Sequence, residues 1–342
     1  MKNKIATLKD IADKLGLSIS TVSRAISDHP DISEQTKSRV MKLVKRLDYQ
    51  PNQLAINLLN QQSNSIGVIV PSIAYYLYAS AISGIEQEAE KHGLKLIICQ
   101  TNESVQRESE IINELLRMRV AGIIVSVSSG GRDFTHFKRI VKRFPLVFFN
   151  RDCSVNASKV MINNHKAAYD LTQHLVETGK RHISFLAGPK TLQISNKRKK
   201  GYLDCLEDFG IETQKEWVCH SPFSQISAMN IVDTLIRKYP EIDALIAFSD
   251  QLAMGALKAI KKYQKSIPDD IAIAGFNNEP ADELLEPPLT SIEQPAFEMG
   301  RKAAELLFNQ IHQTGKYNEQ VVLNSRLIIR RSTWQETTKP ER

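Results

Sequence analysis

The residues between 18 and 24 combine short hydroxyl side chains with one isoleucine and one arginine. Val22 and Ile26 are four residues apart, so on a helix they share the face that packs inward. The opposite face then carries the remaining side chains: Ser18, Ile19, Ser20, Ser23 and Arg24. An arginine can donate to guanine O6 and N7, an isoleucine can contact a thymine methyl group, and hydroxyls, including that of Thr21, can donate to phosphates. The set suits a helix in the major groove of DNA, although an ordinary capped helix pair shares much of the pattern.

Capping residues and apolar spacing predict the helices that position this face. Thr7, followed three residues later by an aspartate, is spaced as a capping box, and Gly16 is suited to end the first helix. Ser18 and Ser33 are placed to begin a second and a third helix. A short helix, a glycine turn and a second helix with a polar face are typical of a helix-turn-helix. We therefore expect residues 1–50 to form an all-helical head that binds DNA.

The positive charge of the chain is concentrated in this region. The whole chain has a formal net charge of +7. Residues 1–62 hold 10 Lys and Arg against 6 Asp and Glu, a net charge of +4, and the remaining 280 residues supply only +3. A basic excess alone is weak support for nucleic-acid binding, but its location beside the expected helix-turn-helix favours double-stranded DNA as a partner.

From Ser65 onward, apolar β-rich runs alternate with amphipathic helix patterns. Strands joined by crossover helices form parallel sheets with helices on both faces. About 280 residues is large for one such sheet, so we expect an α/β core of two lobes, with a ligand cleft between them at the carboxyl ends of the strands. The predicted strands are Ile66–Val70, Leu94–Ile98, Gly122–Val127, Leu146–Phe149, Val160–Ile162, Ile183–Ala187, Ala244–Phe248 and Ile271–Phe276.

Enzymatic, metal-binding and membrane functions leave no signature in the sequence. It has no G-x-x-x-x-G-K-[ST], G-x-G-x-x-G or G-x-S-x-G motif, and its 8 histidines are scattered. We therefore expect no enzyme, no cofactor and no metal. No apolar run approaches the roughly 20 residues that span a bilayer, and the charged start lacks an apolar signal segment, so we expect a cytoplasmic protein without a membrane partner. An exported solute-binding protein with a similar core is the alternative.

Ordered motifs along nearly the whole chain carry a family resemblance. They are Thr7-Leu-Lys-Asp-Ile-Ala, Leu17-Ser-x-x-Thr-Val-Ser-Arg, Ile32-Ser, Tyr49-x-Pro-Asn, Ser65-Ile-Gly-Val-Ile-Val-Pro, Gly188-Pro, Gly275-Phe, Glu286-Pro-Pro-Leu-Thr-Ser-Ile and Met299-Gly. The chain closely resembles the lactose/purine repressor (LacI/GalR-type) family of bacterial transcription regulators. The resemblance implies a regulator, expected to be a repressor, that binds a pseudo-palindromic operator as a homodimer. It also implies control by a small-molecule effector, a carbohydrate such as a sugar or sugar acid.

The resemblance implies roles for individual residues of the head and of the linker that follows. Residues at the positions of Ile19, Ser20 and Arg24 contact bases in the family. The positions that mostly hold phosphates match Thr7, Ser18, Thr21, Ser23, Ser33 and Thr36. Residues 51–64 comprise a hinge helix and a linker: Asn52–Leu59 matches the family's hinge helix, in which Asn52, Ala55 and Leu58 match DNA-contacting positions. Leu58 matches a leucine that is wedged into the minor groove and bends the duplex; simple packing within the hinge is the alternative.

For residues 65–342, the resemblance implies a core of periplasmic-binding-protein type that binds the effector. One lobe is expected at about 65–162 and 292–322, and the other at about 163–291 and 323–336. The candidate effector contacts are Leu77, Tyr78, Ser126, Asn150, Arg198, Phe223, Ser249, Asp250 and Asn277. Aromatic faces with scattered polar groups suit a sugar-like ligand. Tyr78 could instead be a core residue, and Asp250 a helix N-cap.

At Asn277 the sequence departs from the family, which often has an acid there that accepts from a sugar hydroxyl. Loss of that negative charge beside Arg198 suits an anionic ligand such as a uronate or a sugar phosphate. A neutral sugar can also hydrogen-bond to asparagine, so both ligand classes stay open.

Overall fold

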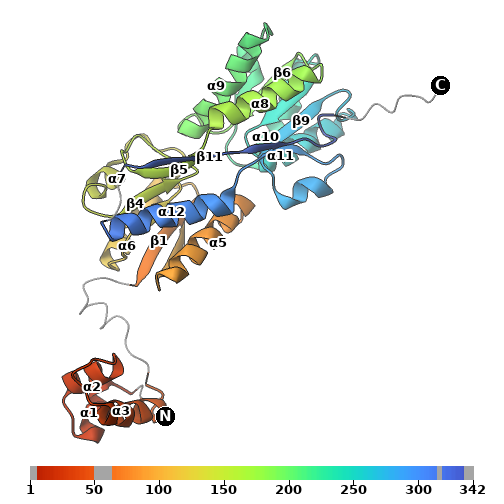
Figure 1. The fold of residues 1–342 in the computed structure, drawn as a ribbon. Coiled ribbons are helices and arrows are strands. Elements are labelled where there is room, and N and C mark those ends of the chain that lie inside the picture. Colours follow the sequence, from red (N-terminus) through yellow and green to blue (C-terminus); the bar gives the residue numbers. More distant parts are fainter. Residues whose placement is uncertain (1–5, 50–63, 314–317, 335–342) are drawn as a thin grey trace. The chain divides into compact units, whose positions relative to one another are not determined.

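The computed structural model describes residues 6–49, 64–313 and 318–334, and the chain divides into two compact units, residues 1–63 and 64–342 (Figure 1). The smaller unit contains α1 (Leu8–Leu15), α2 (Ile19–Ile26) and α3 (Glu34–Arg46). Their apolar stripes meet in a small core in which Ile11, Val22 and Val40 are fully buried. The three predicted helices of the head are confirmed.

The capping interactions of the head follow the sequence. The Asp10 amide donates to Thr7 Oγ1, and the Thr7 amide donates to the Asp10 carboxylate at 2.8 Å, which completes the capping box. Gly16 ends α1 with φ at 64°, a left-handed conformation that glycine adopts at little cost. Ser18 and Ser33 accept from the amides of Thr21 and Thr36 and so cap α2 and α3.

The larger unit holds two six-stranded sheets. The first has the order β11-β5-β4-β3-β1-β2, and all of its pairs are parallel. Its strands are β1 (Ser65–Val70), β2 (Lys95–Gln100), β3 (Ile123–Val125), β4 (Leu146–Phe149), β5 (Ser158–Ile162) and β11 (Gln320–Leu323). Alternate strand residues face opposite sides, so Val68 packs with α5 (Tyr76–Lys91) and α12 (Ala296–Ile311). Ile69 packs with α6 (Val105–Arg117) and α7 (Thr135–Ile140) on the other face.

The second sheet has the order β12-β10-β9-β8-β6-β7. Its strands are β6 (Ile183–Ala187), β7 (Val218–His220), β8 (Ala244–Ala247), β9 (Ala272–Asn277), β10 (Thr290–Glu293) and β12 (Arg326–Ile328). Helices α8 (Asn164–Glu177) and α9 (Gln193–Asp208) cover one face, and α10 (Gln225–Lys238) and α11 (Asp250–Lys262) the other (Figure 1). The pairs are parallel except that β12 runs antiparallel to β10. The predicted α/β core with parallel sheets is confirmed, and the β10–β12 pair at one edge is antiparallel.

The chain passes between the two lobes after β5, after β10 and after β11. Parallel strands end at one edge of each sheet, and loops from both sheets meet there. Short 3-10 helices, η1 (Lys215–Trp217) and η2 (Pro280–Leu284), complete the second lobe. No helix within the described part of the chain is long and apolar enough to cross a membrane.

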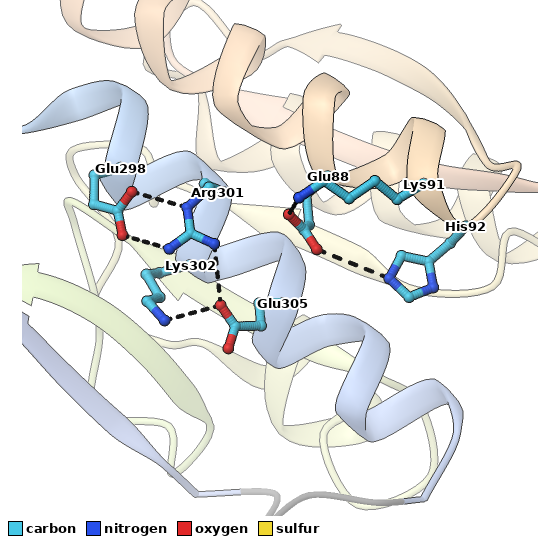
Figure 2. A network of polar contacts seen from close by, with 7 residues as sticks. All are labelled: Glu88, Lys91, His92, Glu298, Arg301, Lys302 and Glu305. Atoms are coloured by element: carbon cyan, nitrogen blue, oxygen red, sulfur yellow. Dashed lines mark hydrogen bonds and ion pairs between the residues drawn. The ribbon is translucent and has the colours of Figure 1, made fainter.

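Helices α5 and α12 approach each other until their backbones touch. A Cβ atom on Gly84 would lie 2.0 Å from the Phe297 carbonyl oxygen, and one on Gly300 would lie 1.9 Å from that of Ala81. Only hydrogen atoms fit at these two positions. Charged side chains flank the contact, and each carboxylate pairs with a cation of its own helix (Figure 2). The residues of this α5–α12 charge network are Glu88, Lys91, His92, Glu298, Arg301, Lys302 and Glu305.

Candidate DNA-binding surface and effector cleft

The outward face of α2 carries the side chains expected to contact bases. Ile19 is 50% exposed although the residues around it that face inward are buried, and Arg24 is also exposed. Ser20 is exposed beside them, whereas Ser23 is half-buried. An apolar side chain is half exposed to water here among the described residues, which fits a surface that meets a thymine methyl group in a major groove.

Hydroxyl groups gather at the first turns of the three helices of the head. Ser18 Oγ lies 2.8 Å from both Ser20 Oγ and Thr21 Oγ1. Ser33 Oγ lies 2.9 Å from Thr36 Oγ1, and Thr7 occupies the same kind of position before α1. Helix N-termini carry partial positive charge and free amides, so hydroxyls placed there can share a phosphate oxygen with the backbone. The other DNA candidates, Asn52, Ala55 and Leu58, lie outside the described residues.

A cleft between the lobes brings together seven of the nine effector candidates. They are Leu77, Tyr78, Asn150, Arg198, Phe223, Ser249 and Asn277. The cleft opens to solvent, and about 460 Å³ of space free of protein atoms, open solvent included, lies within it. Leu77 and Tyr78 come from the first turn of α5, and Asn150 follows β4, so one wall belongs to the first lobe.

Arg198 lies on the opposite wall, fully buried between two rings. Its guanidinium carbon is 4.6 Å from the ring centre of Phe248 and 4.0 Å from that of Phe276. Nε donates to Asn164 Oδ1 at 2.9 Å, and Nη1 donates to the Phe248 carbonyl at 2.6 Å. No carboxylate of the described residues lies within ion-pair distance. Burial, reinforced by the charge of nearby Arg151, lowers the pKa of Arg198 to about 9. Among the described residues, this buried cation is therefore held by two aromatic rings and two neutral oxygens.

Two candidates lie behind the walls of the cleft. Ser126 is fully buried and its hydroxyl is 3.2 Å from the Tyr78 hydroxyl, which also accepts from Asn150 Nδ2 at 3.3 Å. Asp250 is fully buried at the start of α11, where it accepts from Ser291 Oγ and from the Glu279 amide. It is not a helix N-cap, because Ser249 occupies that position. Both residues support the wall from behind in this structure. Tyr78 is buried in the core and lines the cleft as well.

The cleft also contains residues that sequence reasoning missed: Tyr75, Arg151, Ile194, Phe248, Gln251, Glu279 and Gln294. Arg151 is the most unexpected of them. It pairs with Glu103 at 2.8 Å in the first lobe, and its guanidinium lies 4.5 Å from the ring centre of Phe223 in the second. Its position directly after Asn150 was the only sequence signal that could have drawn attention to it.

Carboxyl and amide groups form the remaining polar wall. Asn277 has a φ of 117° and accepts from Gln294 Nε2 at 2.7 Å. Glu279 lies two residues further on, and burial raises the pKa of its carboxyl group. The loss of an acid at position 277 therefore does not remove carboxylates from the cleft. The inference from Asn277 that the cleft favours an anion is weaker than the sequence indicated.

The glycine-rich loop at Ser128–Arg132 does not form an anion cradle. The Ser128 and Ser129 amides donate to buried Glu108 and to Glu103, each at 2.7 Å. The Gly130 amide donates to Thr191 Oγ1 of the other lobe at 2.9 Å. The amides of Ser128, Ser129 and Gly130 are therefore occupied by protein oxygens, and the last of these bonds joins the two lobes. Within the described ranges, no group of His, Cys, Asp and Glu is arranged to hold a metal ion.

Comparison with known proteins gives two family matches that together span most of the chain. Residues 7–52 match the "Bacterial regulatory proteins, lacI family", and residues 63–331 match the "Periplasmic binding proteins and sugar binding domain of LacI family". The ribose operon repressor of Bacillus subtilis (strain 168) is 31% identical over 307 residues, 90% of this chain and 92% of that protein. The HTH-type transcriptional repressor CytR of Escherichia coli (strain K12) is 30% identical over 329 residues, 96% of each chain.

Solved structures agree with this assignment. A complex of the transcriptional regulator CelR with cellobiose has a TM-score of 0.74 at 27% identity and covers 96% of this chain and 99% of that one. The Lac repressor dimer bound to operator and an anti-inducer has a TM-score of 0.85 at 23% identity, over 97% and 100% of the two chains. The second likeness shows the shared fold.

Proposed function

This chain belongs to the LacI family of bacterial regulatory proteins, and we propose that it binds an operator through α2 and a carbohydrate effector in the cleft between its lobes. It is a DNA-binding transcription regulator with a sugar-binding domain, not an enzyme. Because its target is chromosomal DNA, we place it in the cytoplasm. A solute-binding role alone is not favoured, since such a protein has no use for the DNA-binding head.

The exposed face of α2 is the observation that carries the proposal. Arg24 is assigned to a guanine edge, and Ile19 and Ser20 to neighbouring base edges. The hydroxyls at the helix starts are assigned to phosphates, which fix the register of the head on the duplex. These residues are Thr7, Ser18, Thr21, Ser23, Ser33 and Thr36.

Dimer formation and the hinge belong to the same proposal. One head covers only half of a pseudo-palindromic site, so two chains related by twofold symmetry read the whole operator. We assign the head to residues 1–50 and the hinge to 51–64, with Asn52, Ala55 and Leu58 at the minor groove. An apolar wedge there unstacks a base step at a cost of a few kcal/mol, which added contacts repay. The lobes are assigned as 65–162 with 292–322, and 163–291 with 323–336.

The effector is assigned to the cleft because its walls provide both ring faces and polar groups. Arg198 is the proposed anchor, since its buried guanidinium can donate to a hydroxyl or a carboxylate. Sugars and sugar acids can both stack on the rings and hydrogen-bond to the polar groups of the cleft. Effector binding changes the relation of the lobes and thereby the affinity for DNA, and such coupling typically amounts to about 1–3 kcal/mol.

A gel-shift experiment tests the proposal. The full chain is incubated with promoter fragments from the region of its own gene and with scrambled competitor DNA, over a series of salt concentrations. We expect tight binding to one fragment, a steep fall in affinity with salt, and a change in affinity with one member of a panel of sugars and sugar acids. Equal affinity for every duplex, with and without the panel, contradicts the proposal.

A further inference from the structure

Three buried acceptor oxygens of the cleft have no hydrogen-bond partner among the described residues. They are Asn150 Oδ1, Glu279 Oε1 and Gln294 Oε1, and the three residues are at most 7% exposed. An acceptor that is removed from water and left without a donor destabilises the folded chain, so native proteins rarely keep one without a reason. Three such oxygens around one cleft indicate a ligand that brings hydrogen-bond donors.

Glu279 is the best defined of the three, because a chain of side chains fixes its orientation. Lys258 Nζ can only donate, and it donates to Gln225 Oε1 at 3.2 Å. Gln225 Nε2 then donates to Gln251 Oε1, and Gln251 Nε2 donates to Glu279 Oε2, each at 2.8 Å. The direction of every bond in this chain follows from the lysine at its start. Oε2 is therefore occupied by a donor from the protein, and Oε1 is the oxygen left for a ligand.

The backbone holds Glu279 in place as firmly as the side chains do. The residue precedes η2, and its amide donates to Asp250 Oδ2 at 3.2 Å. It follows Asn277, the last residue of β9, by two residues, and the side-chain oxygen of Asn277 already accepts from Gln294. The chain thus presents a carboxylate to the cleft from position 279, while the side-chain oxygen at position 277 accepts from the protein.

We infer that Glu279 is a specificity-determining residue of the effector site, and that its Oε1 accepts a hydrogen bond from a hydroxyl group of the effector. The inference rests on the proposed function, because it requires the cleft to be the effector site. It adds a requirement to that function: the effector carries a donor at one defined position of its ring, whether or not it also carries an anionic group that faces Arg198. A sugar that lacks the donor at that position is rejected.

Glu279→Gln tests the inference sharply because it replaces the free acceptor oxygen, Oε1, with a hydrogen-bond donor. Gln251 still donates toward residue 279, so the amide oxygen of the new glutamine is held there and its NH2 group replaces the free acceptor. Deoxyfluoro sugars complement this change, since fluorine replaces a hydroxyl that donates with a group that cannot. The matched control is Glu283→Gln, which removes an exposed carboxylate of the same 3-10 turn that pairs with Arg330 at 3.0 Å.

The measurement is calorimetric titration of the full chain with D-ribose, D-glucose, D-galactose, cellobiose and D-glucuronate, followed by the singly deoxyfluorinated forms of whichever sugar binds. We expect the wild-type chain and Glu283→Gln to lose about 10- to 100-fold in affinity for one deoxyfluoro sugar, as for a hydrogen bond to a charged group. We expect Glu279→Gln to bind the parent sugar more weakly and to distinguish it from that analogue by less than about threefold. Operator binding without sugar verifies that each variant is folded.

Two results overturn the inference. The first leaves the proposed function intact, and the second contradicts the proposed effector class as well. If Glu279→Gln distinguishes every deoxyfluoro sugar from its parent as the wild-type chain does, the residue does not accept from the effector, and the proposed function stands. If the wild-type chain binds its operator but no sugar of the panel, the proposed effector class is wrong, and the inference is lost together with it.

Discussion

Replacing Asp282 by asparagine tests whether the second lobe contains a buried carboxyl pair that holds a proton. Asp282 and Asp250 are both fully buried, and neither oxygen of Asp282 has a donor among the described residues. Burial raises the pKa of Asp282 to about 6. Burial and the neighbouring charge of Asp282 raise the pKa of Asp250 well above its usual value. Because like charges in one site cannot both ionise cheaply, the folded chain retains a proton that the unfolded chain releases.

The sign and size of the effect follow from this difference. An aspartate in the unfolded chain titrates near pH 4, so between about pH 4 and 6 the folded chain binds more protons. The free energy of unfolding therefore falls as the pH rises through this window. A shift of Asp282 from 3.8 to about 6 corresponds to about 3 kcal/mol at 1.36 kcal/mol per unit. Asparagine has the shape of the protonated acid and cannot ionise, so Asp282→Asn gains about this much relative to wild type between pH 4 and 7.5.

Urea unfolding at a series of pH values provides the measurement. Trp217 is buried in the same lobe, and in a Trp334→Phe background it is the single tryptophan of the chain, so its fluorescence reports this lobe. Glu283→Gln removes an exposed carboxylate one residue away and controls for net charge. A stability difference between Asp282→Asn and wild type that stays constant with pH, or that favours wild type more at high pH, refutes the reasoning.

The remaining predictions address the head, the cleft and the helix contact. Arg24→Ala should cost about 1–3 kcal/mol of operator affinity and relax base preference at one position in a binding-site selection, whereas an equal loss on all duplexes contradicts a base contact. Arg198→Lys keeps the charge but loses the planar fork, so sugar affinity measured by calorimetry should fall at least about tenfold while operator affinity without sugar is unchanged; normal sugar binding excludes Arg198 as the anchor. Gly300→Ala should destabilise the first lobe by at least about 1–3 kcal/mol in thermal unfolding, and a change as small as that of the exposed control Gln87→Ala refutes backbone contact there.

The features predicted correctly from sequence are those that depend on neighbouring residues. The capping box at Thr7 and the left-handed end of α1 at Gly16 need only local geometry, and both are present. All eight predicted strands occur; two have the predicted bounds, and the ends of the others are shifted by at most two residues. The four strands that were missed, β7, β10, β11 and β12, have only three or four residues each. β11 pairs with β5 from a distant part of the chain, so its own sequence contains little of the reason for its conformation.

The residues of the cleft also divide into those that the sequence could indicate and those that depend on distant parts of the chain. The family resemblance marked Asn150 and Ser249, which follow strands whose carboxyl ends meet at one edge of a sheet, and both line the cleft. Arg151 and Glu279 were missed because their place in the cleft depends on Glu103 and Gln251, which come from other elements. Asp250 was expected at the surface of the cleft, but it bonds to Ser291 behind the wall. A sequence alone does not show which of two adjacent residues turns toward a ligand.

The α5–α12 charge network also has a consequence for the salt dependence of DNA binding. Its three carboxylates and three ammonium or guanidinium groups neutralise one another at distances of 2.7 to 3.5 Å (Figure 2). A duplex that approached this network would release few condensed counterions, because Lys91, Arg301 and Lys302 are already paired with carboxylates. The slope of log affinity against log salt concentration therefore reports phosphates that are neutralised elsewhere on the protein. The α5–α12 charge network contributes little to that slope.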